Sequence, residues 1–464
     1  MSTTNSEALA RLVALTADGY PFANLQKKLK EERADIIAPL GSHPVIVKIL
    51  ADLRAAKKLS RIQLIVVATG REAEEITETL RTFDSTAEVL EFQSWETLPH
   101  ERLSPNPETV GKRLKVLHRL NELQETQPDH DVFVIASIRA ALQPVVAGLA
   151  NHPPLTLTKG KDYFLPELSL KLVEHAYTRV DMVTKRGEFA VRGGIVDIFA
   201  TTEEHAVRLE FFGDELEDIR EFSVTDQRSL PLGEEHQPVK AVTLYPAREI
   251  VITPSVASRA REMMHEFPNL STMLTKIAEG MPVEGMESLA PVLCDALVPL
   301  ASYLPEDTAV TILSPEKAAA RAQSLTETNE EFLHAAWDAA ISGSQAPIDL
   351  SGGNFFTVDE FISKVKKTNS LVSLSALLGE GSSDLGFREI PRFTPEQPAA
   401  EWLADLVSQK HKIVIMAHGH GSAERVLEVL TKSELPAILT GSIGQLSSEH
   451  ITVSVGQFAH GFAH

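Results

Sequence analysis

The segment Gly41-Ser42-His43-Pro44-Val45 comes close to the pattern of a phosphate-binding loop. It follows the apolar run ADIIAPL and precedes the apolar segment IVKILADL, so strand, glycine turn and helix occur in the required order. Such a loop also needs a lysine for the β- and γ-phosphates and a hydroxyl for magnesium. Pro44 and Val45 stand at those positions, and proline has no N–H to donate. We therefore expect a degenerate loop that binds no cofactor, and the alternative interpretation is an ordinary strand-to-helix turn.

Arginines in the middle of the chain form a second candidate site, because the charge of their surroundings differs from that of the whole chain. Residues 171–195 contain five basic and three acidic residues, whereas residues 203–226 contain nine acidic and two basic residues. An arginine guanidinium pairs with a carboxylate through two hydrogen bonds and is weakly hydrated, so it is a common anchor in protein interfaces. The pattern predicts either a partner-binding surface or a solvated hairpin with scattered charges.

Metal and nucleophile chemistry have little support in the residue types. His418, His420, His460 and His464 do not have the spacing of a helical histidine pair, and Cys294 is the single cysteine. A cysteine-rich zinc site and an internal disulfide are therefore excluded. We expect no metal site and no catalytic residue, and we interpret the turn that begins at His418 as a plain strand-to-helix connection.

Alternating strand and helix patterns indicate an α/β fold on both sides of a β-rich insertion. Apolar runs at 34–41, 62–70 and 132–138 alternate with segments of helical period at 72–83 and 107–123, as in a parallel sheet with crossover helices. A small α/β domain is predicted after the insertion and the second part of the first domain. The predicted bounds are 1–154 and 241–365 for the two parts of the first domain, 155–240 for the insertion and 366–464 for the last domain.

Two glycine turns define the predicted β-rich insertion. GEFAVRGGIVDIFA (187–200) has apolar runs on both sides of Gly193-Gly194, and AVRLEFFGDELEDIREF (206–222) has them around Gly213-Asp214. Hairpin loops of this kind need a positive φ, which glycine adopts without strain. The sequence therefore predicts two hairpins in a small antiparallel sheet.

The formal net charge of −20 at pH 7 argues against DNA as the main partner, since a duplex is itself a dense array of negative charge. Lys112, Arg113, Lys115 and Arg119 lie on the predicted helix 107–123, and we expect them to face solvent, with DNA contact as the alternative. No run of about 18 apolar residues predicts a membrane span. The start MSTTNSEALARLVAL lacks the features of a secretory signal. We expect a soluble cytoplasmic protein without a membrane partner.

Several stretches give the chain a family resemblance. They are WETLPHERLSPNPETVGKRLKVLHRL (95–120), YTRVDMVTKRGEFAVRGGIVDIF (177–199), RLEFFGDELEDIREFSVTDQRSL (208–230), SYLPEDTAVTIL (302–313) and HGF (460–462). The block RGEFAVRG with DIF and then RLEFFGDE is highly specific. The chain resembles the N-terminal part of the transcription-repair coupling factor (Mfd) family, and the same block is similar to the excision-repair protein UvrB.

The resemblance implies a degenerate, helicase-like parallel-sheet domain of the UvrB kind, with its phosphate loop lost at 41–45. UvrB carries an acidic pair for magnesium where this chain reads Ser-Pro-Glu-Lys at 314–317, so a second feature of the nucleotide site is also lost. The resemblance further implies that the β-rich insertion docks on UvrA, the damage-sensing ATPase. Arg179 and Arg192 stand at positions of docking arginines, whereas Ala190 replaces a further arginine of UvrB and favours the coupling-factor branch.

The resemblance also implies what this chain does not contain. In the full family, ATP hydrolysis with magnesium and DNA translocation belong to a C-terminal half, and a separate domain binds RNA polymerase. The chain would then be a fragment without a cofactor of its own, acting as a non-catalytic module that recruits UvrA in nucleotide excision repair of transcribed DNA. Two alternatives stay open: an active ATP-binding helicase or hydrolase domain, and a DNA-binding module.

Overall fold

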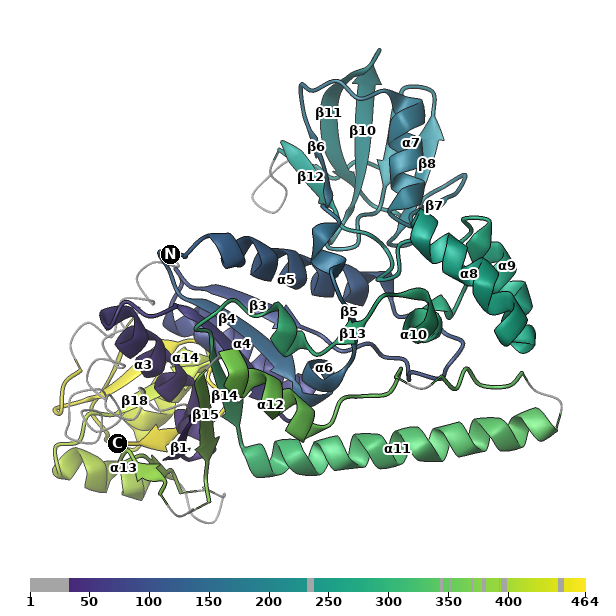
Figure 1. Ribbon diagram of the computed structural model, residues 1–464. Coiled ribbons are helices and arrows are strands. Elements are labelled where there is room, and N and C mark those ends of the chain that lie inside the picture. The colour runs from purple at the N-terminus through teal and green to yellow at the C-terminus, as the bar shows by residue number, and fades with distance from the viewer. Residues whose placement is uncertain are drawn as a thin grey trace.

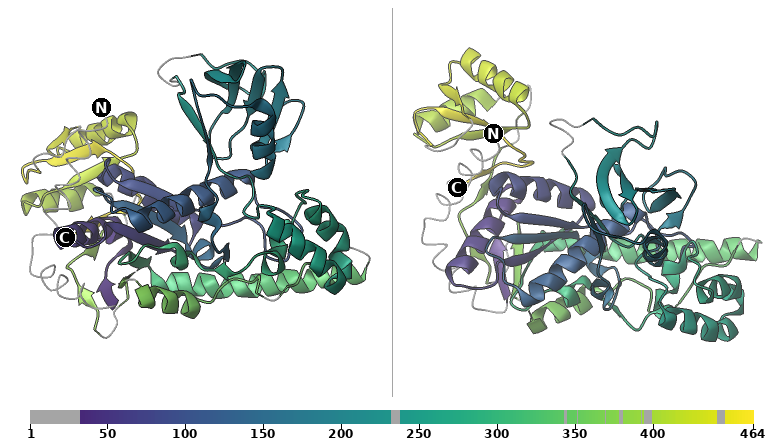
Figure 2. Two further views of the ribbon diagram at one scale, coloured as in Figure 1. Left: turned by 45° about the horizontal axis from the view of Figure 1, so that its top comes forward. Right: turned by 90° about the horizontal axis from the view of Figure 1, so that it is seen from above.

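Figure 1 shows a computed structural model in which a large sheet carries helices on both faces, a β domain projects from it, and a small α/β domain packs at another side. Two further views keep the β domain and the small domain well apart (Figure 2). The expectation about a secretory signal concerns residues outside the described part of the chain. The structure describes residues 33–231, 238–342, 345–350, 352–368, 370–377, 381–391, 393, 399–440 and 446–464.

A parallel sheet forms the centre of the largest domain. Its strands follow the order β16-β1-β15-β14-β2-β4-β3 within the described residues, and each neighbouring pair is parallel. This arrangement confirms the predicted α/β fold class with a parallel sheet. The strands are β1 (Arg33–Ile37), β2 (Ile62–Val67), β3 (Glu88–Phe92), β4 (Val132–Ser137), β14 (Ala309–Leu313), β15 (Ser370–Ser375) and β16 (Ser383–Asp384).

Helices cover both faces of this sheet, which explains why the central strands are apolar without interruption. In β2, Ile65 and Val67 belong to one hydrophobic core, whereas Leu64 and Val66 belong to the core on the other face. A strand between two helix layers has no solvent-facing side, and every residue of β2 and β4 is buried. The first face is covered by α3 (His43–Ala56) and α4 (Gly70–Phe83), and the second by α5 (Pro107–Glu125), α6 (Ile138–Leu142), α11 (Pro315–Ile341) and α12 (Val358–Thr368).

The domain boundary predicted after residue 365 falls inside the large sheet and is therefore corrected. Strands β15 and β16 both follow that residue, yet they pair with β14 and β1 of the large domain. The reason is topological, because β15 inserts between β1 and β14 at the centre of the sheet. The large sheet consequently extends to Asp384.

The inserted domain is built on a sheet with the strand order β11-β10-β9-β8-β7. Both predicted hairpins are confirmed, and Gly193 and Gly213 have φ values of +62° and +63° at their turns. The edge strand β7 pairs parallel with β8, so the sheet is mixed and not purely antiparallel. The strands are β7 (Thr178–Arg179), β8 (Glu188–Arg192), β9 (Ile195–Ile198), β10 (Ala206–Phe212) and β11 (Glu215–Phe222).

The β domain is joined to the large domain at its base. Strand β6 (Leu155–Thr158), where the chain enters, pairs antiparallel with β12 (Ala241–Leu244), where the chain leaves. Helix α7 (Leu165–Glu174) contributes to the core of the same domain. Gly111 of α5 allows close approach of Thr201, since a Cβ at Gly111 would lie 2.3 Å from the threonine Oγ1. These contacts fix the β domain against α5.

A helical unit and the last domain complete the chain, and no helix of the described residues has the length and apolar character to cross a membrane. The helical unit has its own core and consists of α8 (Pro254–Glu266), α9 (Ser271–Ala278) and α10 (Ala290–Leu293). The last domain confirms the predicted small α/β fold; its parallel sheet is ordered β18-β20-β19. Its elements are α13 (Ala399–Ser408), β18 (Val414–Ala417), α14 (His420–Lys432), β19 (Ala437–Leu439) and β20 (Ile451–Val455). Short strands elsewhere are β5 (Val145–Val146), β13 (Leu297–Val298), β17 (Arg388–Glu389) and β21 (Phe462–Ala463).

Candidate functional site

The predicted degenerate loop lies at the carboxyl edge of the large sheet, between β1 and α3. Leu40–Ser42 form a short 3-10 turn, and α3 begins at His43 with Pro44 in its first turn. The hydroxyl of Ser42 donates a hydrogen bond to the carbonyl of Pro39 at 2.8 Å. The strand, turn and helix are therefore present, but the hydroxyl of the turn is used within the turn itself.

His43 does not replace the missing lysine, because its imidazole stays neutral. The residue is 2% exposed, and its Nε2–H donates to the carbonyl of Ala38 at 3.2 Å. Burial, assisted by the nearby charges of Lys317 and His460, lowers the pKa of His43 to about 4. Its Nδ1 has no hydrogen-bond partner among the described residues. A neutral ring offers no positive charge to a phosphate near pH 7.

A cavity of about 320 Å³ opens beside this turn, and its walls disfavour a phosphate chain. Glu72 accepts hydrogen bonds from the backbone N–H groups of Ala68 and Thr69, and Glu75 pairs with Arg71 at 3.0 Å. Two fixed carboxylates and one paired arginine give the cavity no excess of positive charge. It is lined by Leu40, Gly41, His43, Pro44, Val67, Thr69, Arg71, Glu72, Glu75, Ile76, Thr79, Leu313, Ser314, Phe458, Ala459 and His460.

The end of β14 also makes contacts within the protein. This is where the resemblance implies that an acidic pair for magnesium is lost. Ser314 has a left-handed backbone with φ of +49° directly before α11. Glu316 accepts a hydrogen bond from the hydroxyl of Ser375 at 3.1 Å. A single carboxylate that is bonded to the β15 side of the sheet does not make an acidic pair. These contacts support the interpretation of this edge as structural.

The buried His43 predicts a specific loss of stability in acid. Its folded-state pKa lies below that of an unfolded histidine, so the unfolded chain binds the extra proton more readily. The resulting stability is present above about pH 6.5 and is lost as the pH falls towards about pH 4, amounting to about 2 kcal/mol between about pH 7.5 and pH 5. Urea unfolding at both pH values should show this loss in the wild type, and His43→Gln should reduce the loss by that amount. An equal pH dependence in both proteins would contradict the assignment.

Arg179 and Arg192, the predicted docking arginines, lie on adjacent strands of the β domain. Arg179 ends β7 and is aligned with Phe189 of β8, whereas Arg192 ends β8 three positions further along. Because side chains alternate along a strand, this register does not by itself bring the two guanidinium groups to one face. Both residues are solvent-exposed. Arg179 lies on the edge strand, where it remains accessible.

Asp197 is a functional candidate that the sequence analysis missed. Its buried carboxylate accepts hydrogen bonds from Arg192 at 2.6 Å and from Arg208 at 2.7 and 3.0 Å. The strand register aligns Asp197 with Ala190 on β8 and with Arg208 on β10. The hairpin turn at Gly193-Gly194 sets this register, so the sequence did contain the signal. Asp197 holds one end of the Arg192 guanidinium while 53% of that side chain remains exposed.

Arg113 corrects the expectation that the basic residues of α5 face solvent. It is fully buried and pairs with the equally buried Glu249 at 2.5 Å, and its guanidinium lies 4.2 Å from the centre of the Phe92 ring. Arg119 of the same helix pairs with Glu88 at 3.0 Å. Lys112 also pairs with Glu108 at 2.7 Å, so three of the four basic residues have an acidic partner within the protein, which weakens the DNA-binding alternative. The partner of Arg113 is 136 positions away in the sequence, so local pattern could not reveal it.

Comparison with known families defines the class of the β domain. Residues 155–250 match the family model described as the UvrB interaction domain. The matched range contains the whole sheet from β7 to β11, with Arg179, Arg192 and Asp197. The chain is therefore an α/β protein that carries a UvrB interaction domain.

The chain as a whole is similar to bacterial transcription-repair-coupling factors. It is 38% identical over 452 residues to the factors of Mycobacterium bovis and Mycobacterium tuberculosis, which covers 92% of this chain and 36% of each relative. It is 25% identical over 392 residues to the factor of Escherichia coli, which covers 81% of this chain and 32% of that relative. The chain thus spans about a third of the length of these relatives. The comparisons confirm the resemblance to the N-terminal portion of this family.

Proposed function

We propose that this chain is a non-catalytic interaction module of a transcription-repair coupling factor, which recruits UvrA during nucleotide excision repair of transcribed DNA. The match to the UvrB interaction domain supports the proposal. The main structural observation in favour of this proposal is the ion pair between half-exposed Arg192 and buried Asp197. An arginine that is already held in place loses less conformational freedom when a partner carboxylate binds it.

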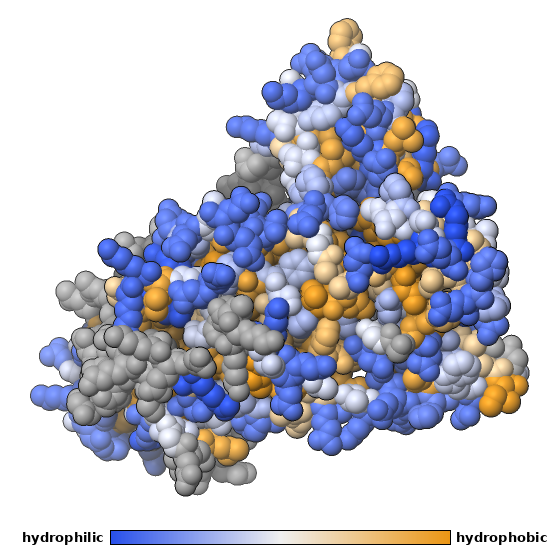
Figure 3. Space-filling model, in the orientation of Figure 1, coloured by the Kyte–Doolittle hydropathy of each residue, from blue (hydrophilic) through white to orange (hydrophobic). Residues whose placement is uncertain are grey.

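Exposed apolar side chains on the β domain, one of them next to Arg192, also support a docking surface. Ile195 is aligned with Arg192 across the β8–β9 hairpin and is 38% exposed. Phe212, at the end of β10, is 79% exposed. The hydropathy surface shows apolar side chains at the end of the β domain that lies far from the large sheet (Figure 3). Exposed apolar side chains beside an anchored arginine are typical of an interface centre.

Truncation of Arg192 tests the proposed docking. If Arg192 is a central contact, Arg192→Ala should weaken UvrA binding by about 2 kcal/mol, which is about 30-fold in Kd. Arg425→Ala is a matched control, since Arg425 is exposed on α14 of the last domain. The measurement is the equilibrium Kd of purified UvrA for each variant, after unfolding curves have shown that the variants are folded.

The same titration can reject the assignment. If the double variant Arg179→Ala/Arg192→Ala binds UvrA as tightly as Arg425→Ala does, the arginines are not part of the docking surface. If the wild-type chain does not bind UvrA at all, the recruitment function itself fails. The two results separate an error in the residues from an error in the partner.

Other activities are proposed for the remainder of a longer protein. Its relatives are about three times as long as this chain, and we assign ATP and magnesium, DNA translocation and RNA polymerase binding to the part beyond it. We further propose that the complete factor acts in the cytoplasm. The neutral His43 and the paired Arg71 support the absence of a cofactor in this chain over the alternative of an active hydrolase domain.

A further inference from the structure

The segment that follows β20 returns from the last domain to the large sheet; we call residues 457–463 the C-terminal strap. The backbone N–H of Gln457 donates to Oγ1 of Thr82 in α4 at 3.4 Å. The ring of Phe458 packs edge-on against Phe83 of the same helix, with 5.6 Å between ring centres. Phe458 and Phe462 also pack against the hydrophobic core of the large domain. The strap therefore contacts α4 as soon as it leaves β20.

Glycines allow the strap to lie against the degenerate loop. A Cβ placed on Gly41 would lie 2.0 Å from the carbonyl oxygen of Gly461, which is far inside van der Waals contact. A Cβ on Gly461 would in turn lie 2.5 Å from Cδ1 of Ile390. Backbone therefore meets backbone at the turn where a phosphate-binding loop would receive its ligand.

The C-terminal end of the strap is also held in place. Phe462–Ala463 form β21, which pairs antiparallel with Arg388–Glu389 of β17. The ring of Phe462 lies 5.4 Å from that of Phe387, which is 2% exposed. Strand pairing and a buried aromatic contact hold this end beside the large sheet.

Between these anchors, Phe458, Ala459 and His460 form one wall of the cavity of about 320 Å³ beside the degenerate loop. We propose that the strap is an intramolecular occupant of this sheet edge: it docks where a ligand would lie, limits access to the cavity by forming one of its walls, and helps to fasten the last domain to the large sheet. A displacement of the strap then widens access to the cavity and removes one of the contacts between the last domain and the large sheet, where Val414 and Met416 of β18 also pack. This inference is independent of UvrA docking, which involves the β domain.

Cysteine labelling tests whether the strap limits access to the cavity. Thr79 lines the cavity and is 3% exposed, so Thr79→Cys reports on access to it. In this background, Gly41→Ala places a methyl group against Gly461, whereas Gly70→Ala is the matched control because a Cβ there meets nothing within 4 Å. We expect the maleimide reaction of the introduced thiol, followed by mass spectrometry, to be about tenfold faster with Gly41→Ala and unchanged with Gly70→Ala.

Cys294 serves as an internal control in the same molecules, since it packs in the separate core of the helical unit. Faster labelling of the introduced thiol at a constant rate of Cys294 supports the strap. Equal acceleration of both thiols shows general unfolding and overturns the inference, and so does an unchanged rate at the introduced thiol. If Gly41→Ala does not fold, Phe458→Ala tests the same contact from the strap side, because it removes the ring that packs on Phe83.

Discussion

Arg113→Ala is expected to lower the free energy of unfolding by about 3–5 kcal/mol, because it leaves a buried carboxylate without its cation. The Arg113 and Glu249 side chains are both 0% exposed. Arg113 also donates to the carbonyl of Gln93 at 2.8 Å, while Glu249 accepts a further hydrogen bond from Nε1 of Trp95 at 2.8 Å. Urea unfolding followed by tryptophan fluorescence measures the change, since Trp95 lies within this network.

Lys112→Ala is the control for this prediction, because Lys112 precedes Arg113 on the same helix. Its ion pair with Glu108 spans 2.7 Å, and the lysine side chain is 41% exposed. An exposed pair of this kind contributes about 0.5 kcal/mol or less. If both variants lose equally little stability, the buried pair of Arg113 and Glu249 does not stabilise the fold as predicted.

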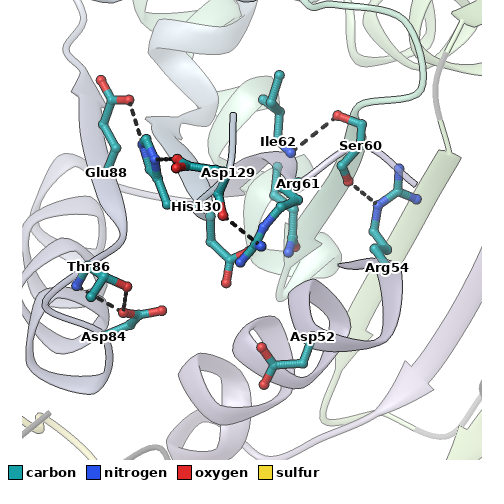
Figure 4. Close-up of polar contacts among 12 residues, drawn as sticks. Asp52, Arg54, Ser60, Arg61, Ile62, Asp84, Thr86, Glu88, Asp129 and His130 are labelled. Atoms are coloured by element: carbon teal, nitrogen blue, oxygen red, sulfur yellow. Dashed lines mark hydrogen bonds and ion pairs between the residues drawn. The ribbon is translucent and has the colours of Figure 1, made fainter. Parts of the chain in front are cut away.

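Lys48→Met is expected to destabilise the protein by about 3 kcal/mol at about pH 7, because the Lys48 ammonium group forms ion pairs with three carboxylates. Lys48 lies 2.6 Å from Asp52, 3.2 Å from Asp84 and 2.7 Å from Asp131, and its side chain is 9% exposed. Arg61 supplies a second cation to Asp131 at 2.9 Å. Figure 4 shows the surrounding contacts, including that of Asp84 with Thr86. Methionine keeps the length of the side chain, so lost charge dominates over lost volume.

The effect of Lys48→Met should shrink in acid. Burial raises the pKa of Asp52, and the charge of Lys48 opposes that rise; the same charge helps the Thr86 hydrogen bond to hold the pKa of Asp84 below its usual value. Without Lys48, both folded-state pKa values rise, so the variant gains stability relative to the wild type as the pH falls. Unfolding curves at about pH 7 and pH 5 test this, with exposed Lys115→Met as the control. If the difference in unfolding free energy between the wild type and Lys48→Met grows in acid, the proposed role of Lys48 is contradicted.

The strands and hairpins were predictable because their signals are local. The apolar run at 62–70 forms β2, and Gly193-Gly194 and Gly213-Asp214 form the two hairpin turns, with a positive φ at Gly193 and Gly213. Burial on both faces of a parallel sheet leaves a continuous apolar run, which needs no knowledge of distant residues. The same reasoning could not show that β15 enters the sheet between β1 and β14, since strand order depends on the whole topology.

The candidate site was predictable only in part, because some of its supporting residues lie far apart in the sequence and others depend on the strand register. The altered chemistry at Pro44 is visible in the sequence, but the approach of Gly461 to Gly41 joins residues about 420 positions apart. Arg192 was predicted through its family resemblance, whereas its anchor Asp197 required the strand register. The expectation that Arg113 faces solvent was wrong. Nothing in the local sequence distinguishes a solvated arginine from one whose buried partner is distant in the sequence.

We propose that the carboxyl edge of the large sheet binds no nucleotide and acts as a scaffold. Isothermal titration of the full chain with magnesium and ATP tests it most directly. We predict no saturable binding up to about 1 mM nucleotide, since Pro44 and neutral His43 offer no cation and the strap contacts the turn. Saturable binding with a micromolar Kd would contradict it.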